Sequence, residues 1–133
     1  MKPQSFFHVA FKVDDPDRAA EFYRTHLDAN VLERRHAEES TSEMAVDAVV
    51  LEVADKLVYL FERAPYEAAG LVDELPTGFL HFGYVVDDIS EAFAHVAAAG
   101  VEIVMEPTQF GDKTIGFFVA PGGVRLELIE YIE

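Results

Sequence analysis

Hydrophobic and polar residues alternate in two stretches of the chain, 6–13 and 79–86, so each stretch is predicted to be a strand with one packed face. The two stretches also match each other in sequence. His81 lies 73 residues after His8, and the paired aspartates that follow each strand keep the same spacing. A histidine at the same position of two similar strands indicates an internal repeat.

The first half of the chain predicts one helix followed by three strands. Asp15 is expected to cap the helix, Pro16 lies in its first turn, and Asn30 is expected to end it. The apolar stripe of this helix is predicted to contain Ala19, Ala20, Phe22, Tyr23 and Leu27. The predicted strands that follow are 31–35, 46–53 and 57–62.

The second half predicts the same order. Asp88 is expected to cap a helix that Gly100 ends, and the three predicted strands that follow are 101–105, stopped by Pro107, then 114–120 and 124–131. We therefore expect an α+β fold of two βαβββ modules that form a cup-like mixed sheet. The chain is interpreted as a single domain, 1–133, with module one at about 5–63, a linker at about 64–77 and module two at about 78–133.

In each of these predicted strands the histidine lies on the face opposite the row of large apolar residues, which is Phe7, Val9, Phe11 and Val13 in the first strand and Leu80, Phe82, Tyr84 and Val86 in the second. Ala10 and Gly83 follow the histidines on these faces, and small residues leave room for a ligand. In the last strand Leu126 and Leu128 pack one way, which turns Glu127 to the other face. Two imidazoles and a carboxylate suit a divalent metal, although a histidine on an apolar strand is more often a hydrogen-bonded core residue. The residues alone leave both interpretations open.

Composition narrows the classes of partner and of chemistry. The net charge is −15, which disfavours binding to nucleic acid or to an anionic membrane surface, and the abundance of acidic residues with few lysines is typical of halophilic proteins. The absence of cysteine excludes disulfides, thiolate metal sites and cysteine nucleophiles. Because we find neither an apolar run of about 18 residues nor a signal-peptide pattern, we expect a cytoplasmic protein.

Several motifs together resemble the vicinal oxygen chelate superfamily. They are the repeat itself, the opening Phe-His-Val-Ala-Phe-Lys-Val-Asp-Asp at 7–15, and the ending Pro-Gly-Gly-Val-Arg-Leu-Glu-Leu-Ile-Glu at 121–130. This superfamily includes glyoxalase I, methylmalonyl-CoA epimerase, fosfomycin resistance proteins, extradiol dioxygenases and bleomycin resistance proteins. The resemblance covers nearly the whole chain and implies the cup-shaped fold.

The resemblance also implies site residues. His8, His81 and Glu127 would be metal ligands, and Tyr59 stands where glyoxalase I-like members have a second glutamate that also acts as the base. Tyr59 is expected to ligate, to donate a proton or to line the pocket. Glu52 is a candidate for the missing base if strand packing turns it into the cleft, and a solvated carboxylate otherwise. The candidate catalytic residues are therefore Glu127, Tyr59 and Glu52.

The function expected from this resemblance is a metal-dependent enzyme with glyoxalase-like (lactoylglutathione lyase-like) isomerase or lyase chemistry. The alternatives are an extradiol-type ring-cleaving dioxygenase with Fe(II), and a metal-free protein that binds a drug or metabolite, as bleomycin resistance proteins do. The expected cofactor is a divalent ion, namely Zn, Ni, Mn, Co or Fe(II), and the expected partner is a small-molecule substrate. Aromatic residues suit an apolar ligand, and few cations are available for an anionic one; we place Phe61, Phe118 and Tyr131, and Lys12, Arg63 and Arg125, on the cleft faces.

Small members of the superfamily usually form homodimers and build each cleft from both chains. The resemblance therefore implies a homodimer. It leaves open whether His8 and His81 meet within one chain or across the dimer.

Overall fold

The computed structural model describes residues 1–132 and contains two compact units. We call His8–Leu80 the N-terminal unit, and Met1–Phe7 together with the chain from His81 onward the C-terminal unit. The chain therefore crosses between the units twice, each time directly before one of the two histidines that the repeat singles out. The expected α+β class and the two βαβββ modules are confirmed.

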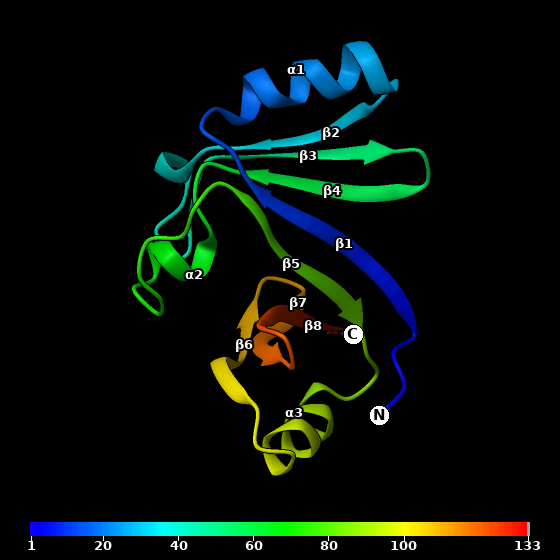
Figure 1. Ribbon diagram of the computed structural model, residues 1–133, viewed down its shortest axis with the longest axis vertical. Coiled ribbons are helices and arrows are strands. Elements are labelled where there is room, and N and C mark those ends of the chain that lie inside the picture. The colour runs from blue at the N-terminus through cyan, green and yellow to red at the C-terminus, as the bar shows by residue number, and fades with distance from the viewer. Residues whose placement is uncertain (133) are drawn as a thin grey trace. The chain divides into compact units, whose positions relative to one another are not determined.

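The N-terminal unit is a mixed four-stranded sheet with one long helix packed on it (Figure 1). Its strands lie in the order β2-β3-β4-β1, with β1 parallel to β4 and the other pairs antiparallel. Its elements are β1 (Ser5–Lys12, of which the first three residues belong to the other unit), α1 (Pro16–Leu27), β2 (Asn30–Arg35), the short 3₁₀ helix η1 (Ala37–Glu39), β3 (Ala48–Val53), β4 (Lys56–Phe61) and α2 (Pro65–Ala68).

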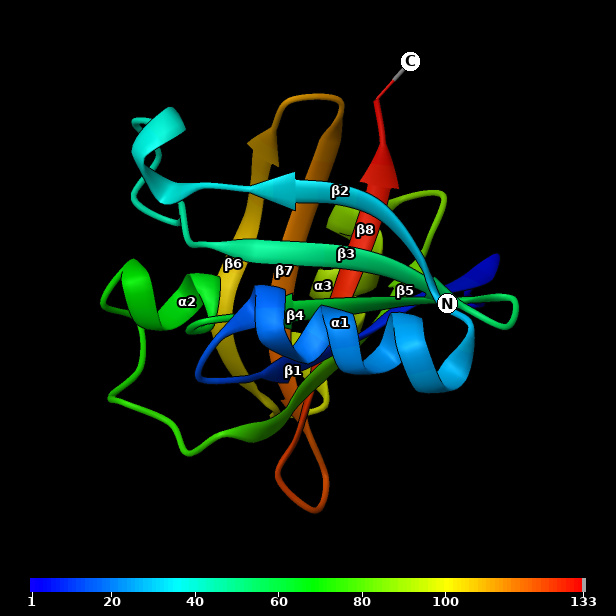
Figure 2. The ribbon, with the colours of Figure 1, turned by 90° about the horizontal axis from the view of Figure 1, so that it is seen from above.

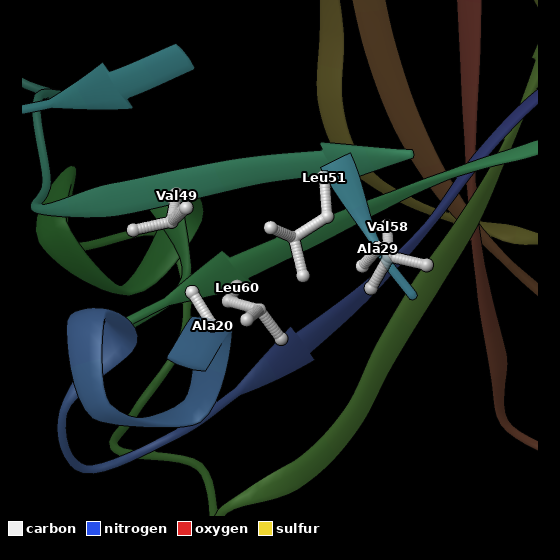
Figure 3. Packing of buried hydrophobic residues seen from close by; sticks show 6 residues of the cluster. All are labelled: Ala20, Ala29, Val49, Leu51, Val58 and Leu60. Carbon is white, nitrogen blue, oxygen red and sulfur yellow. The ribbon is translucent and has the colours of Figure 1, made fainter. Parts of the chain in front are cut away.

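The core of this unit lies between α1 and the sheet, as Figure 3 shows. Strand alternation directs every second residue of β3 and β4 toward the helix. The buried residues of this cluster are Ala20, Ala29, Val49, Leu51, Val58 and Leu60. Ala20 is a small residue on the buried side of α1, and it allows the helix to approach the strands closely.

The sequence-based description of α1 was wrong at two points. Phe22 and Leu27, expected in the apolar stripe, are 60% and 50% exposed, because the helix buries only the narrower side that carries Ala19, Ala20 and Tyr23. The helix also ends before Asn30. Asp28 takes the left-handed cap conformation (φ 52°), which a short polar side chain tolerates. The cap at Asp15 is confirmed, since its side chain accepts a hydrogen bond from the Arg18 N–H.

The C-terminal unit is a second mixed four-stranded sheet, in the order β5-β8-β7-β6, with β5 parallel to β8 (Figure 2 shows β6, β7 and β8 side by side). Its elements are β5 (Gly78–Val85, of which the first three residues belong to the N-terminal unit), α3 (Ile89–Ala98), β6 (Glu102–Phe110), β7 (Lys113–Ala120) and β8 (Val124–Tyr131). Asp88 caps α3 as expected by accepting from the Glu91 N–H, and Glu130 of β8 accepts from the Ile89 N–H.

The α3 side of this sheet holds the second core. Phe93 lies over Gly116 so closely that a Cβ placed there would be 2.5 Å from a ring carbon of Phe93. The expected stop of β6 at Pro107 was wrong. The strand continues to Phe110, because β6 is an edge strand and Pro107 lies where its pairing with β7 shifts between Met105 and Thr108.

Within residues 1–132, none of the helices has the length and apolar character needed to cross a membrane.

Candidate functional site

In the C-terminal unit, a histidine and a glutamate from two neighbouring strands meet on the sheet face that points away from α3. β5 and β8 run parallel with Gly83 opposite Glu127, so His81, two residues before Gly83, projects on the same face as the glutamate. The His81 Nε2 lies 3.4 Å from the Glu127 Oε1. Both residues are buried, with His81 1% and Glu127 7% exposed.

The surroundings of His81 hold its imidazole neutral. The ring packs edge-on against Phe117 of β7, with 5.1 Å between ring centroids. Burial lowers the pKa of His81 to about 3, and the positive charge of Arg125 acts in the same direction. A neutral imidazole keeps a nitrogen lone pair for a metal ion, so at neutral pH this pair presents one nitrogen and one carboxylate oxygen as donors.

In the N-terminal unit, the sheet face opposite α1 carries the other predicted site residues. His8 is 2% exposed and packs against the Tyr59 ring, with 4.6 Å between centroids. The parallel register pairs His8 with Leu57 and Ala10 with Tyr59, so the small Ala10 leaves space beside the tyrosine. The face of this unit therefore brings His8 and Tyr59 together.

Glu52 lies on this same face, as expected if strand packing governs its direction. Val49 and Leu51 of β3 pack toward α1, and the register pairs Glu52 with Leu57, next to His8 in the adjoining strand. Glu52 is half-buried. The structure thus places Glu52 in the same row of the sheet as His8.

Two cleft assignments from the sequence were wrong. Phe118 belongs to the core beneath α3, and its neighbour Phe117 lies on the His81 side, because the register of β7 pairs Phe117 with Glu127. Lys12 is not a free cation for a ligand. Its ammonium is bound by the Glu67 carboxylate at 2.8 Å and by the Leu75 carbonyl at 2.5 Å.

The sequence analysis also missed Arg35, whose guanidinium carbon lies 5.3 Å from the centroid of the Tyr59 ring. Phe61 and Arg125 do share faces with Tyr59 and Glu127, respectively, as predicted. Tyr131 also lies on the Glu127 face of β8, and it is 46% exposed.

Comparison with known proteins identifies the superfamily to which this fold belongs. The family model described as the glyoxalase/bleomycin resistance protein/dioxygenase superfamily matches residues 5–128. The chain belongs to this superfamily. The match confirms the resemblance inferred from the repeat and the terminal motif.

Among curated relatives, a lactoylglutathione lyase of Arabidopsis thaliana is 30% identical over 130 residues, which cover 94% of this chain and 44% of that protein. A probable chloroplastic lactoylglutathione lyase of the same plant is 30% identical over 125 residues, covering 92% of this chain and 35% of that protein. The superfamily domain seen here therefore spans less than half the length of these relatives.

Solved structures share the fold at lower identity. Methylmalonyl-CoA epimerase from Mycobacterium tuberculosis superimposes with a TM-score of 0.74 at 23% identity, covering 98% of this chain and 90% of that one. A hypothetical protein from Bacillus halodurans gives a TM-score of 0.76 at 20% identity, covering 97% and 95%. At these identities the likeness establishes the fold.

Proposed function

We propose that this superfamily member is a metal-dependent enzyme that acts on a small molecule by glyoxalase-like isomerase or lyase chemistry, with His8, His81 and Glu127 as the metal ligands. The observation that carries the proposal is the His81–Glu127 pair, a buried neutral imidazole facing a carboxylate at 3.4 Å. The 30% identity to lactoylglutathione lyases supports the reaction class.

The donor set fits a divalent ion of the first transition series. Each of the three residues offers one ligand atom, all three are buried, and together they would supply two imidazole nitrogens and one carboxylate oxygen. His8 enters the set as the counterpart of His81 in the repeat. Three protein ligands leave coordination positions open for a substrate.

When bound, such an ion would supply Lewis-acid stabilisation to negative charge that develops on two neighbouring substrate oxygens. The residues of the chain would do the rest. Phe117 and Tyr59 would exclude water from the faces that carry the histidines. We assign proton transfer to the Glu52 carboxylate and the Tyr59 hydroxyl, because the resemblance puts Tyr59 where glyoxalase I-like members have their second glutamate and the register puts Glu52 in the row next to His8.

The first experiment is elemental analysis of protein purified without chelator or histidine tag. We expect near-stoichiometric divalent metal in the wild type and its loss in His8→Ala, His81→Ala and Glu127→Ala. His95→Ala, which removes an exposed histidine of α3, is the matched control and should keep the metal. Absence of metal from the wild type, even after reloading with Zn, Ni, Mn, Co or Fe(II), would contradict the proposal and favour the metal-free binding protein.

Activity then tests the reaction class. The metal-loaded wild type should convert the hemithioacetal of glutathione and methylglyoxal to the thioester, followed by ultraviolet absorbance. Glu52→Gln and Tyr59→Phe should lower kcat while the metal content stays unchanged. If both variants keep full kcat, the assignment of proton transfer is wrong.

The Fe(II) dioxygenase is a second candidate because Tyr59 replaces the second carboxylate. Two histidines and one carboxylate with open positions are the ligand set of many non-haem Fe(II) oxygenases. Iron as the bound metal, together with oxygen uptake on addition of a catechol, would select this chemistry over isomerisation.

We also propose a homodimer, because small members of the superfamily usually pair two chains to build each cleft. Sedimentation equilibrium measures this directly, and a monomer at micromolar concentration would refute it.

A further inference from the structure

We propose that Arg35 is a positioning residue that fixes the imidazole of His8 through the ring of Tyr59. The inference rests on the proposed function only in taking His8 as a metal ligand. The chain of contacts lies wholly within the N-terminal unit and crosses its sheet from β2 to β1.

The first link holds the guanidinium. The Glu33 carboxylate accepts two hydrogen bonds from Arg35, one from Nε at 2.9 Å and one from an Nη at 3.2 Å. A two-point pair of this kind favours one orientation of the guanidinium plane. Because the two side chains are 42% and 51% exposed, the pair adds little stability, and its part in the proposal is to orient Arg35.

The second link is the stack on Tyr59. The guanidinium carbon of Arg35 lies 5.3 Å from the centroid of the tyrosine ring, within the range of a cation–π contact. The sheet register explains how a residue of β2 reaches β4. Arg35 pairs with Ala48, whose methyl side chain lets the long arginine cross β3 above the sheet. Tyr59 itself is buried.

The third link reaches His8. The rings of Tyr59 and His8 lie 4.6 Å apart with 57° between their planes, and Phe61 flanks Tyr59 on another side at 5.8 Å. A ligand histidine needs a fixed ring orientation, because its lone pair must point at the metal. Arg35 and Phe61 pack against Tyr59 and limit its movement, so the tyrosine ring in turn restricts the orientation of the His8 ring.

The test uses metal-free protein labelled with ¹⁵N and ¹³C, in which the ring signals of His8 are assigned by their absence in His8→Gln. Arg35→Met keeps the length of the side chain and removes its charge and planar fork. We expect it to shift or broaden the His8 ring signals. Arg34→Met is the matched control, because Arg34 pairs with Val49 on the α1 side, binds Asp17 and should leave these signals in place.

Further variants separate positioning from a general loss of structure. Tyr59→Phe keeps the ring and removes the hydroxyl, which also interacts with Arg35, so it should change the His8 signals less than Tyr59→Leu does. Tyr59→Leu removes both contacts and should reproduce the effect of Arg35→Met. Arg35→Lys should change the His8 ring signals less than Arg35→Met does, since lysine keeps the positive charge but cannot make the two-point hydrogen bond to Glu33. If Arg35→Met fails to fold, Glu33→Gln loosens the same arginine by a smaller change and should still move the His8 signals.

Titration with Co²⁺ alone tests whether the contact of Arg35 with Tyr59 affects metal binding at His8. We expect Arg35→Met to bind Co²⁺ about three- to tenfold more weakly, with altered visible bands, while Arg34→Met behaves as wild type. Unchanged His8 signals in Arg35→Met would overturn the positioning role, even if the wild type binds Co²⁺. Conversely, a wild type that binds no Co²⁺ but whose His8 signals respond to Arg35→Met would refute the proposed metal site and uphold the positioning role.

Discussion

The ion pair between Lys12 and Glu67 should be one of the most sensitive points of the fold. Lys12 Nζ lies 2.8 Å from the Glu67 carboxylate, and the two side chains are only 10% and 6% exposed. The same carboxylate accepts from the backbone N–H of Ala64 at 2.7 Å and of Leu75 at 2.8 Å. Glu67 therefore attaches both α2 and the chain around residue 75 to the His8 face of β1.

Replacing Glu67 with Gln keeps an oxygen acceptor but removes the negative charge. The ammonium of Lys12 would then be buried opposite a neutral amide, and breaking a buried pair in this way costs about 3–5 kcal/mol. We expect the free energy of unfolding to fall by about 3–5 kcal/mol. Ala64 and Leu75 donate to different carboxylate oxygens, and the single oxygen of Gln can keep only one of these two hydrogen bonds. Lys12→Met combined with Glu67→Gln removes both charges and should recover at least half of the loss.

Urea denaturation followed by far-ultraviolet circular dichroism measures these differences, and the exposed Glu21–Arg24 pair provides the control. Its side chains are 57% and 55% exposed, so Glu21→Gln should leave the free energy of unfolding nearly unchanged. An equal cost for Glu67→Gln and Glu21→Gln would refute the reasoning, because it would mean that burial adds nothing to the pair.

The dependence on pH gives a second check on Glu67. Burial raises the pKa of its carboxyl, but the hydrogen bond from Lys12 and those from the Leu75 and Ala64 N–H groups outweigh it, so the pKa is below its ordinary value of 4.5. The stability this group contributes is then present above pH 4.5 and is lost as pH falls through the lower, folded-state pKa. The difference in the free energy of unfolding between the wild type and Glu67→Gln should therefore become smaller at acidic pH.

Three further predictions concern stability. Gly116→Ala should cost about 1–3 kcal/mol by urea denaturation, because the added methyl meets Phe93, and Phe93→Leu in the same chain should relieve part of that cost. Asp15→Ala and Asp88→Ala should each cost about 1 kcal/mol, since both side chains cap a helix in the same way; a difference well above that value would show that the repeat is not equivalent at its caps. In metal-free protein, the lowered pKa of His81 makes the unfolded state bind the extra proton, so stability should be full above pH 6.5 and fall by up to about 1.4 kcal/mol per pH unit between 6.5 and about 3; a wild-type curve parallel to that of His81→Gln would contradict this.

The alternation of residues along the strands predicts which sheet face each side chain occupies, because the faces follow a period of two. It predicted that Glu127 projects away from the leucines beside it, and the parallel register of β5 and β8 confirms that His81 shares its face. The matching aspartate caps were equally predictable, since a cap depends on a few adjacent residues. Features that depend only on residues close together in the sequence, such as strand faces and helix caps, could thus be predicted from the sequence.

Features that depend on distant partners were not. Pro107 stops a central strand but is tolerated at an edge, and only the order of the strands shows that β6 is the edge. Phe117 and Phe118 are adjacent and equally apolar, so nothing in the residues themselves says which one faces His81. That choice is made by Gly116, which pairs with Leu128 on the α3 side and admits the ring of Phe93.

The hydrophobic pattern alone does not predict the face on which Arg35 lies. Val31 packs on the α1 core, so strict alternation would place Arg35, four residues later, on that same side. The register of β2 shifts between Val31, which pairs with Leu51, and Glu33, which pairs with Val50. This irregularity turns Glu33 and Arg35 to the Tyr59 face and leaves Arg34 toward α1, where it binds Asp17. Bulges are common on edge strands such as β2, and they also redirect side chains beside active sites; the one in β2 turns Arg35 to the face that carries Tyr59.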